Sequence, residues 1–300
     1  MSSILYKYKK WTPFTKDIIT SAQIYCATPN ELNDPFDCKA EIFSSQFKMS
    51  IDEQVMSIHI SSFFMFYLSS SATLISESEK KLIKKGMEKH KGDLKGLFNY
   101  INSYFDSTAP MAPKLSTGKD MIEAFEKKSS MLGVFSLTEV PNHMLMWAHY
   151  ADQHKGIAIG FEKSKNNDLG NIDKCRQINY VTNFPKSDIS LIQQKMIYSI
   201  GKEGKGTREI DMDINNPLVQ QAFYQKAESW SYEKEWRLLE QKGGVRELPG
   251  KILEIIFGYN CPVETIKEVK GIAKEHIKNN VRFFKVGSKA NSFELVLERL

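Results

Sequence analysis

Two acidic residues in the C-terminal third have the types and the spacing that glycosyl chemistry needs. Glu233 and Glu235 lie two positions apart in the segment WSYEKEWR, residues 230–237. Residues i and i+2 of a β-strand point to the same face, so these carboxylates would lie side by side. Such carboxylates repel each other, and one holds a raised pKa unless a cation lies between them. In glycosyl transfer one carboxylate stabilises a cationic sugar carbon and the other orients or deprotonates the acceptor. A solvated strand paired with Arg237 is the alternative.

Aromatic and cationic residues alternate near the N-terminus. Tyr6 and Tyr8 flank Lys7 in the segment LYKYK. On a strand, one face would be aromatic and the other cationic. A lysine there could meet a phosphate, and a tyrosine could stack on a ring of a ligand. An edge strand whose lysines discourage aggregation explains the same pattern.

Two further clusters combine polar and aromatic residues. Residues 33–37, NDPFD, predict a tight turn that Phe36 anchors to the core. Asn33 either contacts a ligand or has only a structural role in the turn. On a helix at 142–151, Trp147 and Tyr150 share a face, and His149 lies on another side. A histidine in this setting is more often a structural hydrogen-bonding group than a metal ligand, and no metal site is predicted.

Strand and helix patterns place these clusters on a mixed fold. Branched and aromatic runs predict strands at residues 4–8, 23–27, 133–138, 155–161, 177–181, 235–240, 252–258, 281–286 and 293–297. Helices are expected at 142–151, 218–229 and 263–278, and as more than one helix within 50–130, where Ser50 and Glu53 form a capping box. The prediction is a single α+β domain, residues 1–300, with a mostly antiparallel core and a helical insertion at 48–130.

Composition limits the class of protein. Hydrophobic residues make up 41% and charged residues 26%, which excludes a disordered chain, a collagen and a coiled coil. No apolar stretch is long enough to cross a bilayer, and the four widely spaced cysteines predict reduced thiols. These features predict a cytoplasmic protein. The net charge of +5 permits a nucleic-acid partner without requiring one. The chain contains no P-loop, dinucleotide-binding, zincin or nucleophile-elbow motif.

The four clusters, in this order, resemble a bacterial family known as domain of unknown function 2971 (DUF2971). Its members have an opening L-Y-K/R-Y, an N-D-P-F-[DE] turn, W-x-H-Y-[AG]-x-x-H-x-G and W-x-x-E-x-E-[WY]-R, which match residues 5–8, 33–37, 147–156 and 230–237. The layout is also similar, more distantly, to the ADP-ribosyltransferase superfamily. That similarity implies a split, mostly antiparallel sheet and NAD as the substrate.

The superfamily similarity also assigns roles to residues. It places Tyr6 or Lys7 on the first strand near the ribose or diphosphate, Tyr25 on the second strand at the nicotinamide, and Glu235 on a later strand at the ribose hydroxyl. The first strand here carries lysine and tyrosine, where the superfamily has arginine or histidine. Glu233 is the second catalytic candidate. The other candidates for NAD binding are Asn33, Phe36, Trp147, His149 and Tyr150.

The function expected is therefore cleavage of the nicotinamide glycosidic bond of NAD and transfer of ADP-ribose to a protein, RNA or DNA acceptor. The resemblance suggests a toxin or phage-defence effector, with an antitoxin protein as partner. Two alternatives stay open. In one, the aromatic clusters form a stacking platform in a non-catalytic nucleotide- or nucleic-acid-binding module. In the other, Asp34, Asp37, Glu233 and Glu235 hold the metal of a nuclease.

Overall fold

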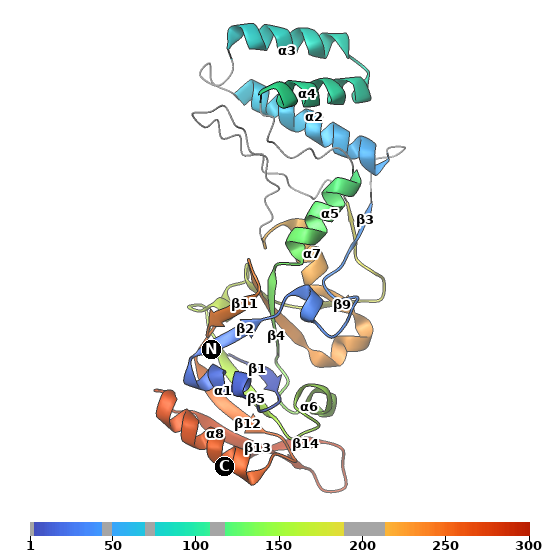
Figure 1. The fold of residues 1–300 in the computed structure, drawn as a ribbon. Coiled ribbons are helices and arrows are strands. Elements are labelled where there is room, and N and C mark those ends of the chain that lie inside the picture. The colour runs from blue at the N-terminus through green and yellow to red at the C-terminus, as the bar shows by residue number, and fades with distance from the viewer. Residues whose placement is uncertain (1–2, 44–49, 70–75, 109–117, 189–213) are drawn as a thin grey trace. The chain divides into compact units, whose positions relative to one another are not determined.

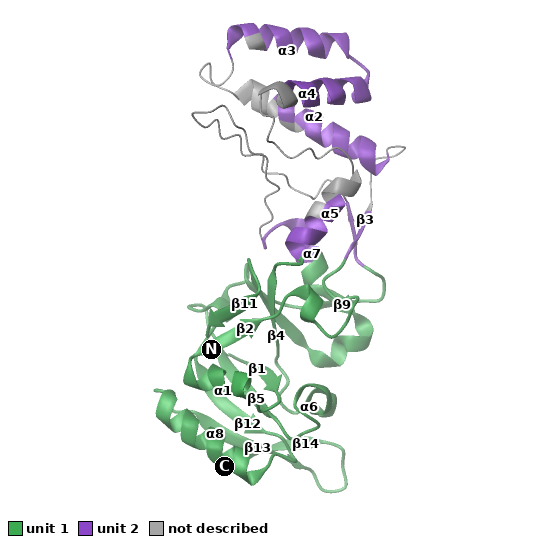
Figure 2. Cartoon of the chain, viewed as in Figure 1, with its two compact units in different colours: residues 1–39, 130–184, 222–300 green, residues 40–129, 185–221 purple. Residues whose placement is uncertain are grey.

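The chain folds into two compact units. The computed structural model describes residues 3–43, 50–69, 76–108, 118–188 and 214–300 (Figure 1). Unit 1 contains residues 1–39, 130–184 and 222–300, and unit 2 contains residues 40–129 and 185–221 (Figure 2). The predicted helical insertion at 48–130 belongs to unit 2 up to residue 129, and its residues 48–49, 70–75 and 109–117 lie outside the described residues. That the chain is a single domain with this insertion stays a prediction.

Unit 1 is built on an eight-stranded sheet with the order β14-β13-β12-β5-β1-β4-β10-β6. Its neighbouring strands are antiparallel except for β12 and β13, which are parallel. The α+β prediction with a mostly antiparallel core is therefore confirmed. The strands are β1 (Ser3–Lys9), β4 (Gly133–Thr138), β5 (Ile157–Lys163), β6 (Cys175–Gln177), β10 (Glu235–Glu240), β12 (Ile252–Phe257), β13 (Arg282–Ser288) and β14 (Leu295–Arg299).

The sheet is divided between β1 and β4. Strand β1 pairs with β5 along its whole length, and β4 pairs with β10 along its whole length. Between β1 and β4, the register contains a single pair, Tyr6 with Thr138. Farther along β4, Val134 exchanges both main-chain hydrogen bonds with Ala27 instead of with β1. The two halves of the sheet therefore separate on either side of the Tyr6–Thr138 pair.

Helices cover both faces of the sheet. Leu5 lies in one core with residues of helices α1 (Pro13–Thr20) and α8 (Val263–His276). Tyr6 and Tyr8 lie in a second core with residues of α6 (Met144–Tyr150). The alternation along β1 thus places successive side chains in different cores. Helix α1 was not predicted from the sequence; it begins after Thr12, whose hydroxyl accepts a hydrogen bond from the Thr15 amide.

Two small sheets complete unit 1. Strand β2 (Gln23–Cys26) pairs with β11 (Gly244–Glu247), and β7 (Asn179–Val181) runs parallel to β9 (Gln225–Ala227). The predicted helix at 218–229 is wrong in its second half, because α7 (Pro217–Phe223) ends before β9. The side chain of Lys226 in β9 points inward to acidic residues, which an exposed helix position would not allow. The cysteines of unit 1 are buried, unpaired thiols.

Unit 2 contains the helices that were predicted within residues 50–130. They are α2 (Ile51–Ser69), α3 (Glu77–Lys89), α4 (Leu94–Thr108) and α5 (Gly118–Ser129), with the parallel pair β3 (Glu41–Phe43) and β8 (Lys186–Asp188). Ser50 and Glu53 exchange the two hydrogen bonds of the predicted capping box. Ile60, Phe63 and Ile83 form a core with residues of α4. None of the described helices combines the length and apolar composition needed to span a bilayer.

Candidate active site

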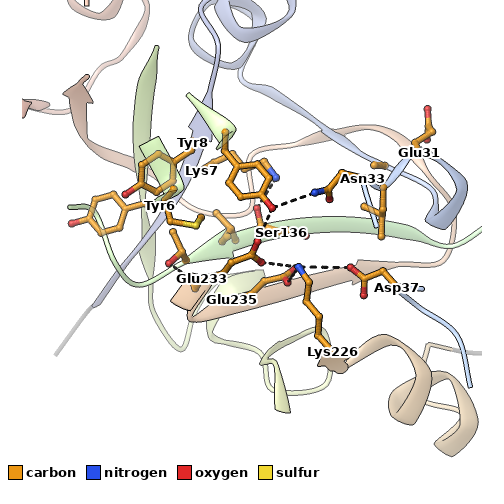
Figure 3. Close-up of a pocket in the computed structure, with 16 residues that line it drawn as sticks. Tyr6, Lys7, Tyr8, Glu31, Asn33, Asp37, Ser136, Lys226, Glu233 and Glu235 are labelled. Atoms are coloured by element: carbon orange, nitrogen blue, oxygen red, sulfur yellow. Dashed lines mark hydrogen bonds and ion pairs between the residues drawn. The ribbon is translucent and has the colours of Figure 1, made fainter. Parts of the chain in front are cut away.

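A cavity of about 250 Å³ lies where β1 and β4 separate (Figure 3). Unit 1 alone supplies its walls: β1, the segment from residue 27 to 37, β4, α6, β9, Glu233 and the start of β10. The polar residues of the wall are Tyr6, Lys7, Tyr8, Glu31, Asn33, Asp37, Ser136, Thr138, Tyr150, Lys226, Glu233 and Glu235. The structure therefore brings the N-terminal tyrosine-lysine strand and the late acidic pair into one cavity, as the sequence analysis required.

The ammonium of Lys226 lies between the two glutamates. Its Nζ atom is 2.7 Å from Glu233 Oε2, 3.0 Å from Glu235 Oε2 and 3.8 Å from Asp37 Oδ2. The dashed lines in Figure 3 mark these contacts. All four side chains are buried, and the ring centroid of Trp230 lies 4.9 Å from the same nitrogen. A buried charge needs a partner of opposite sign, and here one cation serves three acids.

Arg237 is a second buried cation of the cluster. Its Nε donates to Glu235 Oε1 at 2.7 Å, and one terminal nitrogen donates to both oxygens of Asp37, at 2.8 and 2.7 Å. The other terminal nitrogen donates to the carbonyl of Phe223 at 2.9 Å. The guanidinium is fully buried, so these bonds replace its hydration. The alternative of a solvent-exposed strand is thus wrong, although the expected ion pairing with Arg237 exists.

These cations determine the ionisation of Glu235. Burial alone would raise its pKa, but Arg237 and Lys226, with hydrogen bonds from Arg237 and Ser136, lower the pKa to about 2. Burial would lower the pKa of Lys226, but Glu235, Glu233 and Asp37 together hold it above its usual value. The sequence analysis expected a raised pKa for one glutamate unless a cation lay between the two, and the structure supplies that cation.

Glu233 reaches the cluster from outside the strand. The prediction that both glutamates lie on one strand is wrong, because Glu233 is the last residue of a 3₁₀ turn, Glu228–Glu233. Lys234 then adopts a left-handed conformation with φ of 46°, and β10 begins at Glu235. The hydroxyl of Thr138 donates to the carbonyl of Glu233 at 2.5 Å, which fixes this turn to β4. The carboxylates meet through Lys226 and not through strand alternation.

Hydrogen bonds join helix α6 and the NDPFD turn to the acidic cluster. The Tyr150 hydroxyl donates to Glu233 Oε1 at 2.6 Å, and Asn33 Nδ2 donates to the Tyr150 oxygen at 3.3 Å. Burial and the bond to Glu233 raise the pKa of Tyr150 above its usual value. The Trp230 indole donates to Asp34 Oδ2 at 2.8 Å. Motifs that are far apart in the sequence therefore form one hydrogen-bonded network.

Strand β1 forms the opposite wall. Lys7 Nζ donates to the carbonyl of Ser136 at 2.6 Å. Burial, followed by the nearby charge of Lys9, lowers the pKa of Lys7 to about 7. Tyr6 and Tyr8 also line the cavity, and their hydroxyls donate to Glu254 and to the carbonyl of Val140. Strand β1 thus contributes two tyrosines and one amine to this wall.

Four predicted binding residues do not line the cavity. Tyr25 is half exposed and donates to Glu31, which does line it. Phe36 is 73% exposed, so its expected role as a core anchor is wrong; the polar bonds of Asp34 hold the turn instead. Trp147 is fully buried, with its ring 4.8 Å from that of Tyr8. His149 is exposed.

The sequence analysis missed several residues of the site. Lys226 fell within a predicted helix, and nothing in its spacing marks it as a partner of the glutamates. Asp37 was named only as a metal ligand. Ser136, Thr138 and Tyr180 were not named; the Tyr180 hydroxyl accepts the amide of Glu235 at 2.8 Å. These residues belong to separate segments, so their convergence depends on the sheet pairing.

The acids do not fit the metal site of a nuclease. Asp37, Glu233 and Glu235 do meet, but the Lys226 ammonium and the Arg237 guanidinium take the positions between their oxygens. Asp34 instead accepts from Trp230. Among the described residues, no group of three or more acidic, histidine or cysteine side chains is arranged to hold a metal ion.

Comparison with known protein families supports the DUF2971 resemblance. The model of the family described as Protein of unknown function (DUF2971) matches residues 146–238. This segment contains Tyr150, Lys226, Glu233, Glu235 and Arg237, which form most of the buried cluster. No curated protein and no solved structure matches the chain significantly.

Proposed function

We propose that the protein is an NAD-dependent ADP-ribosyltransferase whose cavity holds the nicotinamide-ribose end of NAD. The observation that carries the proposal is the convergence of Glu233 and Glu235 with the tyrosine-lysine strand β1 in one cavity, at the division of the sheet. A cavity of about 250 Å³ is smaller than the roughly 300 to 1,000 Å³ of most ligand pockets. It therefore suits one end of a dinucleotide, and the adenylate end would lie outside.

The charge of the cluster suits this chemistry. In the ion-pair cluster, three carboxylates face two cations, Lys226 and Arg237, which leaves a formal excess of one negative charge. The amine of Lys7 on the opposite wall has a pKa of about 7 and is only partly charged at neutral pH. The nicotinamide ring of NAD is cationic, and breaking its glycosidic bond moves the positive charge to the ribose carbon. Preorganised negative charge stabilises a transition state in which positive charge develops. Because the pKa of Glu235 is about 2, this carboxylate is ionised at neutral pH.

The residues take distinct roles in the proposed reaction. The bond between the ribose C1 and the nicotinamide nitrogen breaks, and its electron pair leaves with neutral nicotinamide. Glu235 stabilises the cationic ribose. An acceptor nucleophile then forms a bond to C1, and Glu233 takes up the proton that the acceptor loses. Tyr6 and Tyr8, which line the cavity, lie beside the ligand.

The division of the sheet supports an ADP-ribosyltransferase-like fold as part of the same proposal. The separation of β1 and β4 beyond the Tyr6–Thr138 pair lies beside the cavity, in keeping with the split sheet that the superfamily similarity implies. A protein, RNA or DNA acceptor and a role in toxicity or phage defence with an antitoxin partner are further parts of the proposal, carried by the resemblance alone.

Release of nicotinamide from NAD is the test. We expect the wild-type protein to release it, and Glu235→Gln to slow the release by about 100-fold or more, since one preorganised charge contributes that much to many transition states. Glu240→Gln is the matched control, because Glu240 ends the same strand and does not line the cavity. Its rate should equal that of the wild type.

Two results would contradict the proposal. Undiminished release by folded Glu235→Gln removes the role assigned to that residue. Binding of NAD or a nucleic acid without any release of nicotinamide favours the non-catalytic binding module instead.

A further inference from the structure

Lys226 has contacts that the proposed reaction does not use. It projects from the short strand β9 into the acidic cluster, and 5% of its side chain is exposed. An ammonium has three N–H donors. Two form hydrogen bonds to Glu233 and Glu235, and the third faces Asp37 at 3.8 Å. Although the side chain forms part of the cavity wall, its donors are all directed to acids and not to a ligand.

No other described residue joins the two glutamates. Arg237 bonds Glu235 and Asp37 but makes no bond to Glu233. The described hydrogen bonds of the Glu233 carboxylate come from Lys226 and Tyr150. Without the ammonium, the Glu233 carboxylate would keep only the Tyr150 hydroxyl as a partner, and repulsion among the three buried carboxylates would protonate one of them or drive them apart.

We propose that Lys226 is a positioning residue, which keeps the carboxylates of Glu233 and Glu235 ionised and adjacent on the cavity wall. The role rests on the proposed function of the cavity, because it acts through these two acids. Alternation along a single strand does not bring the two acids together in this fold, because Glu233 precedes β10. The ion pairs with Lys226 bring them together instead. Trp230 covers the ammonium with its ring, which limits access of water to the ion pairs.

The titration of this cluster involves groups from several elements. The charged and titratable side chains that face Lys226 or its two glutamates are Lys7, Asp37, Cys38, Tyr150, Tyr180, Tyr232 and Arg237. Among the described residues, Lys226 alone forms hydrogen bonds to both glutamates. Its removal should therefore affect both glutamates together, whereas Arg237, whose charge is the larger influence on Glu235, bonds only one of them.

The first test needs no substrate. In protein with ¹³C-labelled glutamate side chains, NMR follows the titration of each carboxyl carbon, and the signals are assigned by their loss in Glu233→Gln and Glu235→Gln. In Lys226→Met, we expect Glu233 or Glu235 to titrate about 1 to 3 pH units higher than in the wild type. Lys226→Arg retains the charge and should restore most of the wild-type titration.

Lys174→Met is the matched control. Lys174 also lies between two acids, Asp168 at 3.1 Å and Glu240 at 3.9 Å, and it does not line the cavity. Its replacement should leave the titration of Glu233 and Glu235 unchanged. Unchanged titration in Lys226→Met, or an equal shift in the control, overturns the proposal. If Lys226→Met does not fold, the titration of the wild-type protein is the test. Uptake of a proton by Glu233 or Glu235 near neutral pH in the wild type overturns the proposal.

The second test uses nicotinamide release. The acid limb of the pH profile should move to higher pH in Lys226→Met and return in Lys226→Arg. A loss of rate that is equal at every pH, with the limb unmoved, means a structural role only and overturns the proposal. If the wild type releases no nicotinamide, the proposed function fails, and the NMR titration still decides the role of Lys226.

Discussion

At the scale of single residues, the site is a cluster of buried charges whose stability depends on complete pairing. Removing a carboxylate or an ammonium from water costs several kcal/mol, and only close partners offset that cost. Arg237, fully buried, finds its partners in Glu235, Asp37 and a main-chain carbonyl. A protein gains little stability from such a cluster relative to apolar packing. The cluster therefore indicates a functional use of the charges.

The pH dependence of stability tests this pairing. The pKa of Glu235 is about 2 in the folded protein and 4.5 without the protein environment. Because the folded-state value is lowered, ionised Glu235 stabilises the fold above about pH 4.5, and this contribution is lost as the pH falls toward 2. The difference in unfolding free energy between the wild type and Glu235→Gln should therefore be large at pH 7 and shrink toward pH 2. Urea unfolding at several pH values measures it, and a difference independent of pH contradicts the assigned pairing.

At the scale of elements, glycines allow the close approach of the segments that build the site. Gly156 connects the loop after α6 to β5, the neighbour of β1. A Cβ atom at this position would lie 2.2 Å from the carbonyl oxygen of Lys9 and 3.0 Å from that of Ala151. Both are main-chain atoms, which cannot move aside as the end of a long side chain can. The last position of the motif W-x-H-Y-[AG]-x-x-H-x-G, Gly156, is thus a glycine because a side chain would not fit there.

Replacement of this glycine tests the argument. Gly156→Ala should lower the free energy of unfolding by about 1 to 3 kcal/mol, the usual cost of an overpacked site. Gly271→Ala is the control, because Gly271 is exposed on α8 with no atom within 4 Å of the added Cβ. That change should be neutral or stabilise by up to about 1 kcal/mol. Equal effects in urea unfolding would show that close packing at residue 156 does not matter.

The elements themselves were largely predictable, since strand patterns are local. Residues 133–138 and 235–240 were predicted as the strands β4 and β10 with the observed bounds. The helix at 218–229 was wrong past Phe223, because Lys226 adopts a strand conformation to meet acids distant in sequence. Likewise, Phe36 was placed in the core on its apolar character, whereas the bonds of its neighbours hold it at the surface. Local patterns do not contain such tertiary interactions.

At the scale of the whole molecule, the account rests on unit 1, where segments from both ends of the chain share one cavity. Strand β1 begins at Ser3 and the acids lie beyond residue 230, yet β4 joins them by pairing with both β1 and β10. Sequence motifs named the segments that meet, but the ion pairs among them required the structure. Lys226 and Asp37 illustrate this limit, because neither has a spacing that indicates its partners.

A crystal structure of the protein with an NAD analogue whose nicotinamide-ribose bond cannot be cleaved would show what the cavity binds. We expect the nicotinamide ribose in the cavity between β1 and β4, with a ribose hydroxyl within hydrogen-bond distance of Glu235. Density for the ligand elsewhere on the protein, or an empty cavity at saturating concentrations of an analogue that binds in solution, would rule out the proposed function of this cavity.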